Sequence, residues 1–336
     1  MRAYRIHEAS GPDALRREDL PEPEAGPGQV VVRVRAASLN YRDLLVIKGA
    51  YSRNLPLPLI PLSDGAGEVV AVGPGVTRFR AGDRVAGCFF SAWDAGPITE
   101  AAPKSALGGA VDGILAELVA LPEGGLVRVP DHLTDEEAAT LPCAALTAWH
   151  ALMEGGGLVA GQTVLVQGTG GVSLFALQFA RMAGARVIAT SSSDAKLARA
   201  RDLGASDGIN YKTTEDWDVA VRNLTGGIGV DHVVEVGGAG TLPRSIKATR
   251  LGGQIALIGV LTGGGEIDPR PLLMKNIRLQ GIYVGSRPMF EAMNRAIARH
   301  KLRPVVDRVF PFEDAVAAYK HLEGGSHFGK IVIKVG

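Results

Sequence analysis

Thr163-Val-Leu-Val-Gln-Gly168-Thr-Gly170-Gly171-Val172-Ser173 is the stretch that decides the fold. An apolar run typical of a buried strand stops here at a glycine turn, and a helical pattern follows directly. The apolar residues of that pattern recur at helical spacing up to Ala183, which places them on one face. We interpret the stretch as the strand, turn and helix that begin a dinucleotide-binding βαβ unit.

The glycines of this turn have physical reasons to be glycine. Gly168 allows a sharp turn after the strand, and Gly170 has no Cβ, so a pyrophosphate could approach the backbone closely. The first N–H groups of the following helix lack internal partners and carry the positive end of the helix dipole, which suits an anion. The spacing departs from G-x-G-x-x-G because Ser173 stands at the third position. The motif alone also fits a glycine-rich turn in any α/β protein.

Strand-like apolar runs recur around this motif at intervals of 22 or 23 residues. They begin near Thr163, Arg186, Gly208, Asp231, Gln254 and Ile277. Helical patterns separate the first four runs, over Val172–Ala183, Asp194–Leu203 and Thr214–Leu224. Asp194 is the expected cap of the second helix, and Gly204 lies just past its end. Six parallel strands with right-handed crossovers make a doubly wound α/β sheet, which is the fold class that we predict.

The end of the second strand distinguishes between two forms of the nucleotide. An NAD site usually has Asp or Glu about 20 residues after the glycines, where it binds the ribose 2′-hydroxyl. Here the strand ends in Ser191-Ser192-Ser193, with Lys196 one turn later. Hydroxyl and ammonium groups suit a 2′-phosphate, which favours NADP(H). The alternative is that the serines are turn residues and that Asp194 binds a ribose.

Composition indicates a soluble globular chain of two domains. Its 336 residues are 46% hydrophobic and 21% charged, with a net charge of +1. That charge provides no bulk attraction to nucleic acid or to anionic lipid. We expect no signal peptide, because the start MRAYRIHEAS has no apolar h-region, and no membrane span, because no apolar run approaches about 18 residues. With two cysteines, Cys88 and Cys143, a reduced, cytoplasmic setting is the simple expectation.

The region before residue 131 has a different pattern. Short strands alternate with Gly and Pro turns, which predicts a small barrel or sandwich; examples are Val30–Arg35, Glu68–Val72 and Arg84–Ala86. Residues 93–109 have no firm period, and we expect a loop there. Helical patterns and a last strand follow the sixth Rossmann strand, so we expect the chain to return to the first domain. The predicted domains are 1–130 with 288–336, and 131–287, with cofactor and substrate in the cleft between them.

The order of these segments resembles the medium-chain dehydrogenase/reductase superfamily. The stretches that carry the resemblance are Ser38–Leu45, Asp64–Val76 with Ala81–Val85, Leu141–Trp149 and Gly168–Ala183. The resemblance implies a GroES-like catalytic domain together with a Rossmann coenzyme domain. It also implies a homodimer that pairs through the outer strand, which we predict at Ile277–Val284.

Zinc-dependent members of this superfamily hold a catalytic metal with Cys, His and Cys. In this chain the first Cys position is Asn40 and the His position is Ser63, so only Cys143 matches. One ligand of three cannot hold zinc, and Cys88 alone cannot form the four-cysteine structural site. We therefore expect no metal. The chain resembles the zinc-free branch, which includes quinone oxidoreductases and related enone reductases.

The resemblance also implies a set of cofactor-binding residues. For the pyrophosphate and nicotinamide they are Thr147, Gly168, Gly170, Gly171 and Val172, and for the adenosine 2′-phosphate they are Ser191, Ser192, Ser193, Lys196 and Tyr211. Along the carboxyl edge of the sheet they are Val236, Gly237, Gly259, Val260, Tyr283, Val284 and Gly285, with Phe328 and Lys330 as a C-terminal clamp on the nicotinamide. Packing alone is the alternative explanation for each of these residues.

Four residues are candidates for catalysis. Asn40 could donate a hydrogen bond to a substrate carbonyl or to the nicotinamide ribose, and Asp43 could orient its neighbours. Tyr51 and Ser63 are candidate proton donors, while the alternative for Asn40 and Asp43 is that they only hold their loop.

The predicted function is that of a zinc-independent, NADPH-dependent oxidoreductase. It would transfer hydride to a small-molecule quinone or α,β-unsaturated carbonyl, mainly through proximity and orientation. The alternatives are a zinc-free NAD(P)-dependent alcohol dehydrogenase and a non-catalytic NADPH-binding protein.

Overall fold

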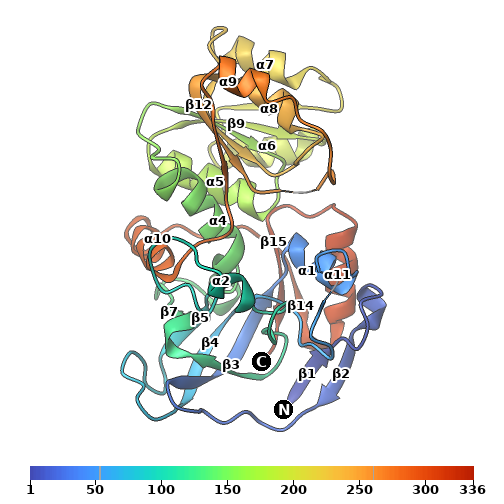
Figure 1. Cartoon of the computed structure of the whole chain (residues 1–336), viewed down its shortest axis with the longest axis vertical. Coiled ribbons are helices and arrows are strands. Elements are labelled where there is room, and N and C mark those ends of the chain that lie inside the picture. The colour runs from blue at the N-terminus through green and yellow to red at the C-terminus, as the bar shows by residue number, and fades with distance from the viewer. Residues whose placement is uncertain (53, 260) are drawn as a thin grey trace. The chain divides into compact units, whose positions relative to one another are not determined.

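A computed structural model describes residues 1–52, 54–259 and 261–336 of this chain. Contacts between residues divide it into two units, Met1–Leu146 with Gly285–Gly336, and Thr147–Val284. The second unit is therefore inserted into the first along the chain, as the colours of Figure 1 trace. The domain limits given above, at residues 130 and 288, stay a prediction.

Six parallel strands form the sheet of the inserted unit, in the order β10-β9-β8-β11-β12-β13. The chain enters in the middle and winds outward in both directions, which confirms the predicted doubly wound Rossmann sheet. β13 is one edge, as expected. The strands are β8 (Thr163–Gln167), β9 (Arg186–Ser191), β10 (Asp207–Asn210), β11 (Val230–Glu235), β12 (Thr249–Leu257) and β13 (Arg278–Gly281). The helices are η4 (His150–Glu154), α5 (Gly171–Met182), α6 (Asp194–Asp202), α7 (Trp217–Leu224), α8 (Leu242–Ala248) and α9 (Arg270–Met274).

Three details of this unit differ from the prediction, and the first is that α7 begins at Trp217 and not at Thr214. The cap of α6 is Ser193, whose hydroxyl accepts a hydrogen bond from the Lys196 N–H at 3.4 Å, while Asp194 is already inside the helix. β12 begins at Thr249, because Thr249 pairs with Val230 before a register shift in the ladder. Gly204 follows α6 with φ of +106°, which is the left-handed conformation expected just past a helix end.

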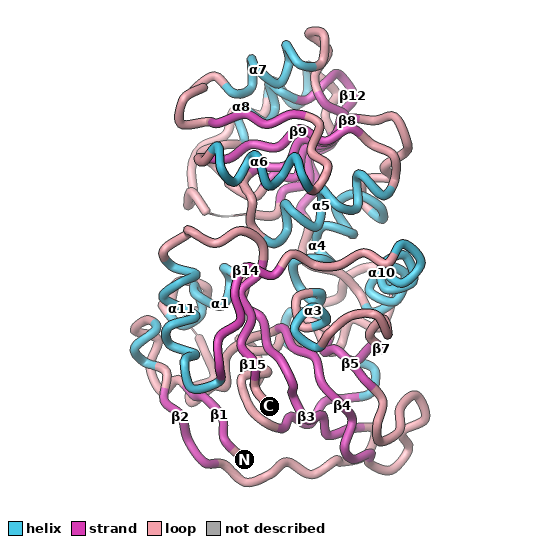
Figure 2. The backbone as a smooth tube through the Cα atoms, turned by 180° about the vertical axis from the view of Figure 1, so that it is seen from behind, coloured by secondary structure: helices cyan, strands magenta, loops and turns pink. Residues whose placement is uncertain are grey.

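The other unit is built on a mostly antiparallel sheet in the order β14-β15-β3-β4-β5-β7 (Figure 2). In addition, β6 pairs with β3. The strands of that sheet are β3 (Gln29–Ser38), β4 (Asp64–Val72), β5 (Arg84–Gly87), β6 (Leu118–Pro122), β7 (Leu126–Arg128), β14 (Val306–Pro311) and β15 (Lys330–Lys334). A separate two-stranded sheet pairs β1 (Arg2–Arg5) with β2 (Arg16–Asp19). Val30, Val32 and Val34 alternate along β3 and lie in the core. The predicted β-rich domain is confirmed.

Helices complete this unit. The α-helices are α1 (Tyr41–Ile47), α2 (Ala101–Lys104), α3 (Asp135–Ala138), α10 (Arg287–His300) and α11 (Ala315–Glu323), and α4 (Leu146–Trp149) continues into the inserted unit. The others are η1 (Pro12–Ala14), η2 (Glu123–Gly125), η3 (Leu141–Ala145) and η5 (Phe312–Asp314). α2 lies within the segment for which we predicted only a loop. Across the three described ranges, no helix is both long and apolar enough to cross a membrane.

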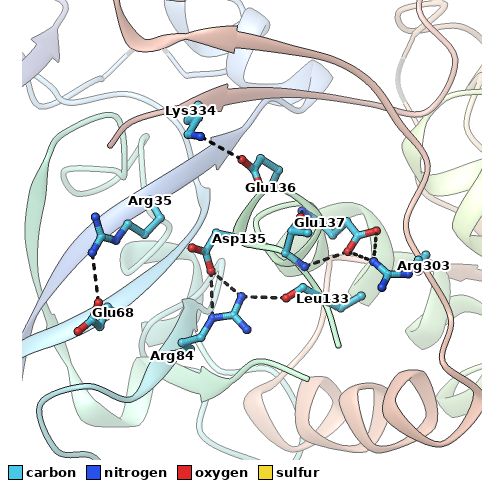
Figure 3. Close-up of polar contacts among 10 residues, drawn as sticks. Arg35, Glu68, Arg84, Leu133, Asp135, Glu136, Glu137, Arg303 and Lys334 are labelled. Atoms are coloured by element: carbon cyan, nitrogen blue, oxygen red, sulfur yellow. Dashed lines mark hydrogen bonds and ion pairs between the residues drawn. The ribbon is translucent and has the colours of Figure 1, made fainter. Parts of the chain in front are cut away.

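Ion pairs hold α3 against the strands of this unit (Figure 3). Arg84 of β5 donates to Asp135 at 2.5 Å and to the Leu133 carbonyl at 2.9 Å. Arg303 pairs with Glu137 at 2.8 Å. Such partly exposed pairs contribute about 0–1 kcal/mol each, so their main effect is to fix the helix that leads into η3.

Candidate active site

The glycine turn after β8 has the conformation that the motif predicts. Gly168 has φ of +71°, in the left-handed region, and α5 begins at Gly171. The Ser173 hydroxyl donates to the Gln167 carbonyl at 2.6 Å. The residue that breaks the G-x-x-G spacing therefore ties the first turn of the helix to the end of the strand.

Gly170 lies in open space within this turn. Its backbone is extended, with φ of −79° and ψ of −178°, so any residue could adopt it. A Cβ built at Gly170 would meet no atom within 4 Å. Neither packing nor backbone strain requires glycine here, and a ligand that approaches the backbone closely would require it.

Sequence reasoning missed a buried carboxylate beside this turn. Glu235, the last residue of β11, is fully buried, and its Oε1 accepts from the N–H groups of Gly237 and Gly238 at 2.8 and 3.0 Å and from Thr241 Oγ1 at 2.5 Å. Its Oε2 accepts from Gln167 Nε2 at 2.9 Å and from the Ser245 hydroxyl. Glu235 thus fixes the loop after β11 against the end of β8. An acidic residue that ends an apolar strand was the only signal in the sequence.

The three serines at the end of β9 have different roles. Ser191 is buried and accepts from the Ser193 N–H at 3.3 Å, and Ser193 caps α6. Ser192 is exposed. Asp194 accepts from Asn210 Nδ2 at 2.9 Å, so this carboxylate is held by a neighbour from β10.

The other residues expected around the phosphate lie on neighbouring segments. Lys196 is half-buried in α6. Tyr211 follows β10, its N–H donates to the Ser191 carbonyl at 3.0 Å, and its side chain is exposed. The second and third strands therefore bring Tyr211 and the serine turn to the same edge of the sheet.

Packing accounts for two of the glycines assigned to the cofactor. A Cβ on Gly259 would lie 1.5 Å from the Val236 carbonyl oxygen, and one on Gly237 would lie 2.2 Å from Thr241 Oγ1. Val260 lies outside the described residues. The assignment of Gly259 and Gly237 to the cofactor stays a prediction, and their identity as glycine follows from the neighbouring backbone and side chain.

The remaining cofactor candidates lie on both units, and their roles also stay predictions. In the inserted unit Thr147 is buried, Val172 is half-buried and Tyr283 is exposed. Val284 has φ of +53°, and its carbonyl lies 2.8 Å from His150 Nδ1. A β-branched residue with positive φ is unusual and marks a strained segment.

In the other unit the C-terminal candidates are buried. Phe328 is 2% exposed, and its N–H donates to Asp307 Oδ1 at 2.9 Å. Gly285 is buried, and a Cβ on it would lie 2.9 Å from Leu146 Cγ. Lys330 belongs to the polar cluster described next.

Asp43 has a structural role at the start of α1. Its Oδ2 accepts from the Asn40 N–H at 2.8 Å, and its Oδ1 lies 3.3 Å from Arg42 Nη1. Burial raises the pKa of Asp43, and the charge of Arg42 opposes that shift. Arg42 also lies over the Tyr51 ring, 5.0 Å from its centroid, which brings Tyr51 to this cluster. The capping contact supports the loop-holding alternative for Asp43.

A chain of hydrogen bonds runs from Lys330 to Asp64. Lys330 Nζ donates to Asn40 Oδ1 at 2.5 Å, Asn40 Nδ2 donates to Ser63 Oγ at 3.3 Å, and Ser63 donates to Asp64 Oδ1 at 2.8 Å. Asp64 Oδ2 accepts from the Cys143 N–H at 3.0 Å. Asn40, Ser63 and Lys330 are thus brought together as one network.

These positions do not fit the family's catalytic zinc. Asn40 and Ser63 offer an amide and a hydroxyl, and desolvation raises the pKa of the Cys143 thiol, which keeps it protonated. Within the part of the chain that the structure describes, no group of three or more His, Cys, Asp or Glu side chains is arranged to hold a metal ion. We derive no metal-dependent step for this site.

Asp64 is expected to make stability depend on pH. Burial, with the nearby charge of Asp43, raises its pKa to about 6 against 3.8 in a model compound. The native state then binds more protons than the unfolded state between these values, so the contribution of Asp64 to stability falls as pH rises through this window. Urea titrations give the unfolding free energies of the wild type and of Asp64→Asn. The excess of the wild-type value over the Asp64→Asn value should fall by about 2 kcal/mol between pH 4 and pH 6.5. A constant or rising difference would contradict this assignment.

The chain combines a doubly wound sheet that has an open glycine turn with a GroES-like β-domain that has a buried polar cluster. This combination defines a nicotinamide-dependent oxidoreductase. The chain matches two families: the alcohol dehydrogenase GroES-like domain over residues 26–131 and the zinc-binding dehydrogenase over residues 171–299. The second range contains none of the zinc-ligand positions Asn40, Ser63 and Cys143. The chain belongs to the medium-chain dehydrogenase/reductase superfamily.

Relatives cover the chain along its whole length. A zinc-type alcohol dehydrogenase-like protein of Schizosaccharomyces pombe is 45% identical over 99% of each chain. A crystal structure from Sinorhizobium meliloti, provisionally assigned as an alcohol dehydrogenase, is 46% identical with a TM-score of 0.93 over 99% of this chain and 98% of that one. An NAD-dependent alcohol dehydrogenase is 40% identical with a TM-score of 0.92 over 100% of each chain.

Two relatives of lower identity bear on the cofactor and the acceptor. A mycobacterial protein solved in complex with NADPH is 31% identical, with a TM-score of 0.85 over 100% of each chain. The quinone oxidoreductase of Rattus norvegicus is 29% identical over 99% of this chain and 97% of its own. The chain is therefore an oxidoreductase of the quinone oxidoreductase or alcohol dehydrogenase-like type.

Proposed function

We propose that this chain is a zinc-independent, NADPH-dependent oxidoreductase that reduces a quinone or an α,β-unsaturated carbonyl. The observation that carries the proposal is the Lys330–Asn40–Ser63–Asp64 network, which stands where the zinc-dependent members have metal ligands. Such a site can donate hydrogen bonds but has no strong Lewis acid. Quinones and activated alkenes suit it, because the negative charge that develops on them is delocalised.

The glycine turn and the end of β9 would bind the cofactor. The N–H groups at the start of α5 and the open backbone at Gly170 suit a pyrophosphate. The exposed Ser192, with Lys196 and Tyr211, supports a 2′-phosphate, while Asn210 holds Asp194 and argues against the ribose alternative. Bound NADPH would supply the hydride.

The residues of the GroES-like unit would bind and protonate the acceptor. Asn40 has one amide N–H toward Ser63 and also interacts with the Asp64 carboxylate, and an acceptor oxygen could replace that carboxylate as partner of the second N–H. Tyr51, exposed beside Arg42, and Ser63 are the candidate proton donors. After hydride transfer one proton is needed to complete the reduced product, and these hydroxyl groups could deliver it.

An alcohol dehydrogenase is the second candidate, because the 40%-identical relative carries that name with NAD. Steady-state assays distinguish the two. The proposal is supported if the protein oxidises NADPH with naphthoquinones and enones as acceptors and if elemental analysis finds no stoichiometric zinc in that protein. Alcohol-driven reduction of NAD⁺ or NADP⁺ without quinone turnover supports the second candidate, and stoichiometric zinc that survives dialysis contradicts zinc independence.

Ser192→Asp should shift the preference of the enzyme from NADPH toward NADH. A carboxylate at the exposed tip of β9 would repel a 2′-phosphate and could accept from a ribose 2′-hydroxyl. We expect the ratio of kcat/KM for NADPH to that for NADH to fall at least about 10-fold, or about 1.4 kcal/mol. Ser206→Asp is the matched control, because it adds the same charge at an exposed serine just before β10, at the opposite edge of the sheet. An unchanged ratio in Ser192→Asp would reject the phosphate site.

We further propose that the protein is a cytoplasmic homodimer that pairs through β13. This strand is an edge of the Rossmann sheet, and Leu273 and Met274 of the preceding α9 are 82% and 81% exposed. Gel filtration at the monomer mass would contradict the dimer.

A further inference from the structure

A buried ammonium group contacts the first of the family's zinc-ligand positions. Lys330 is 3% exposed, and its Nζ donates to the Leu39 carbonyl and to Asn40 Oδ1, each at 2.5 Å. β15 pairs antiparallel with β3, with Val332 opposite Ser38. Continuing that register by two residues sets Lys330 opposite Asn40, so the contact follows from the strand pairing of the sheet.

This contact sets the orientation of the Asn40 amide. An ammonium group can only donate, so it selects the carbonyl oxygen of the amide and turns the NH₂ group toward Ser63. Asn40 is 8% exposed. One N–H of Asn40 bonds Ser63, and the amide also interacts with the Asp64 carboxylate, so an acceptor oxygen would take the place of that carboxylate as partner of the second N–H.

The charge of Lys330 is balanced within the same cluster. Asp43 and Asp64 are 1% and 0% exposed, and the positive charge of Lys330 acts on both carboxylates against the effect of their burial. A neutral residue at position 330 would leave two buried acids with Arg42 as the cation beside them. The ammonium group of Lys330 therefore balances charge within this buried cluster.

We propose that Lys330 is a positioning residue that takes over the electrostatic role of the missing metal. It holds the Asn40 amide in one orientation and polarises it, so that the second N–H becomes a stronger donor to the oxygen on which negative charge develops. The inference rests on the proposed reduction of quinones or enones. It differs from a nicotinamide clamp, because the ammonium acts through Asn40.

Kinetics with two acceptors test this role. Lys330→Met removes the charge at similar length, and Lys330→Arg keeps it. At saturating NADPH, Lys330→Met should lower kcat about 100-fold for a simple enone, whose enolate charge needs the donor, but only about 5-fold for a naphthoquinone. Lys330→Arg should recover most of the enone activity. A purely structural role would reduce both activities by the same factor.

Asn40→Ala provides the second variant. With Lys330 intact, Asn40→Ala should lower the ratio of enone activity to quinone activity, as Lys330→Met does. The role of the amide can therefore be tested even if Lys330→Met does not fold. In the Asn40→Ala background, Lys330→Met should change that ratio by less than about 2-fold, because the ammonium acts through the amide. Equal losses on both acceptors, or independent effects of the two substitutions, would overturn the proposal.

Nuclear magnetic resonance separates this proposal from the proposed function. If the wild type reduces neither acceptor, the proposed function fails. The side-chain amide resonance of Asn40 then tests the contact: it should shift in Lys330→Met and return toward its wild-type position in Lys330→Arg. An Asn40 resonance unchanged in Lys330→Met would reject the network itself.

Discussion

Gly259→Ala is expected to destabilise the protein by about 4 kcal/mol or to prevent folding. The Cβ would lie 1.5 Å from the Val236 carbonyl oxygen and 2.1 Å from the Val236 carbonyl carbon, both backbone atoms. Backbone at the end of β11 cannot rotate away as a flexible side chain can, so the ends of β11 and β12 would have to separate. Urea unfolding followed by tryptophan fluorescence measures the loss.

Gly281→Ala is the matched control for this substitution. Gly281 ends β13 in the same sheet, and a Cβ there would meet no atom within 4 Å. We expect a change in unfolding free energy within about 0.5 kcal/mol. Similar stability of the Gly259→Ala and Gly281→Ala proteins would contradict the close approach of Gly259 to the Val236 backbone.

Gly170→Ala is expected to weaken NADPH binding about 100-fold, or close to 3 kcal/mol, with little effect on the fold. The extended backbone accepts alanine and the Cβ meets open space, so the unfolding free energy should change by less than about 1 kcal/mol. The methyl group would instead stand where a pyrophosphate approaches the helix. Titration calorimetry of the variant measures the affinity, and urea unfolding measures the stability.

Gly168→Ala helps to separate the effect on NADPH affinity from the effect on stability. Its φ of +71° strains any side chain, so this variant should lose about 1 kcal/mol of stability as well as affinity. Unchanged NADPH affinity in Gly170→Ala would show that the dinucleotide does not lie along this turn.

Periodicity predicted the Rossmann sheet well, because its strands are buried on both faces. β8 and β9 begin at Thr163 and Arg186, where the apolar runs begin. The start of β12 was placed too late, because a strand that continues through Gly252 and Gly253 beyond a register shift has no apolar signal. The cap of α6 was misplaced because serine and aspartate cap helices about equally well.

The candidate site was predictable only in part. Asn40 and Ser63 could be found because they replace metal ligands, and Asp43 because it follows Asn40 closely. The contact between Asn40 and Lys330 joins residues 290 positions apart and depends on the register of β15 against β3, which no local pattern contains. Glu235 was missed for a related reason: its five donors come from β8, the loop after β11 and α8.

Titration calorimetry of the purified wild-type protein with NADPH and with NADH tests the central claim most directly. We expect saturable binding of NADPH, at least about 10-fold tighter than that of NADH. Tighter binding of NADH would contradict the phosphate site at the end of β9, and no heat with either dinucleotide would leave the proposed reaction without a hydride source.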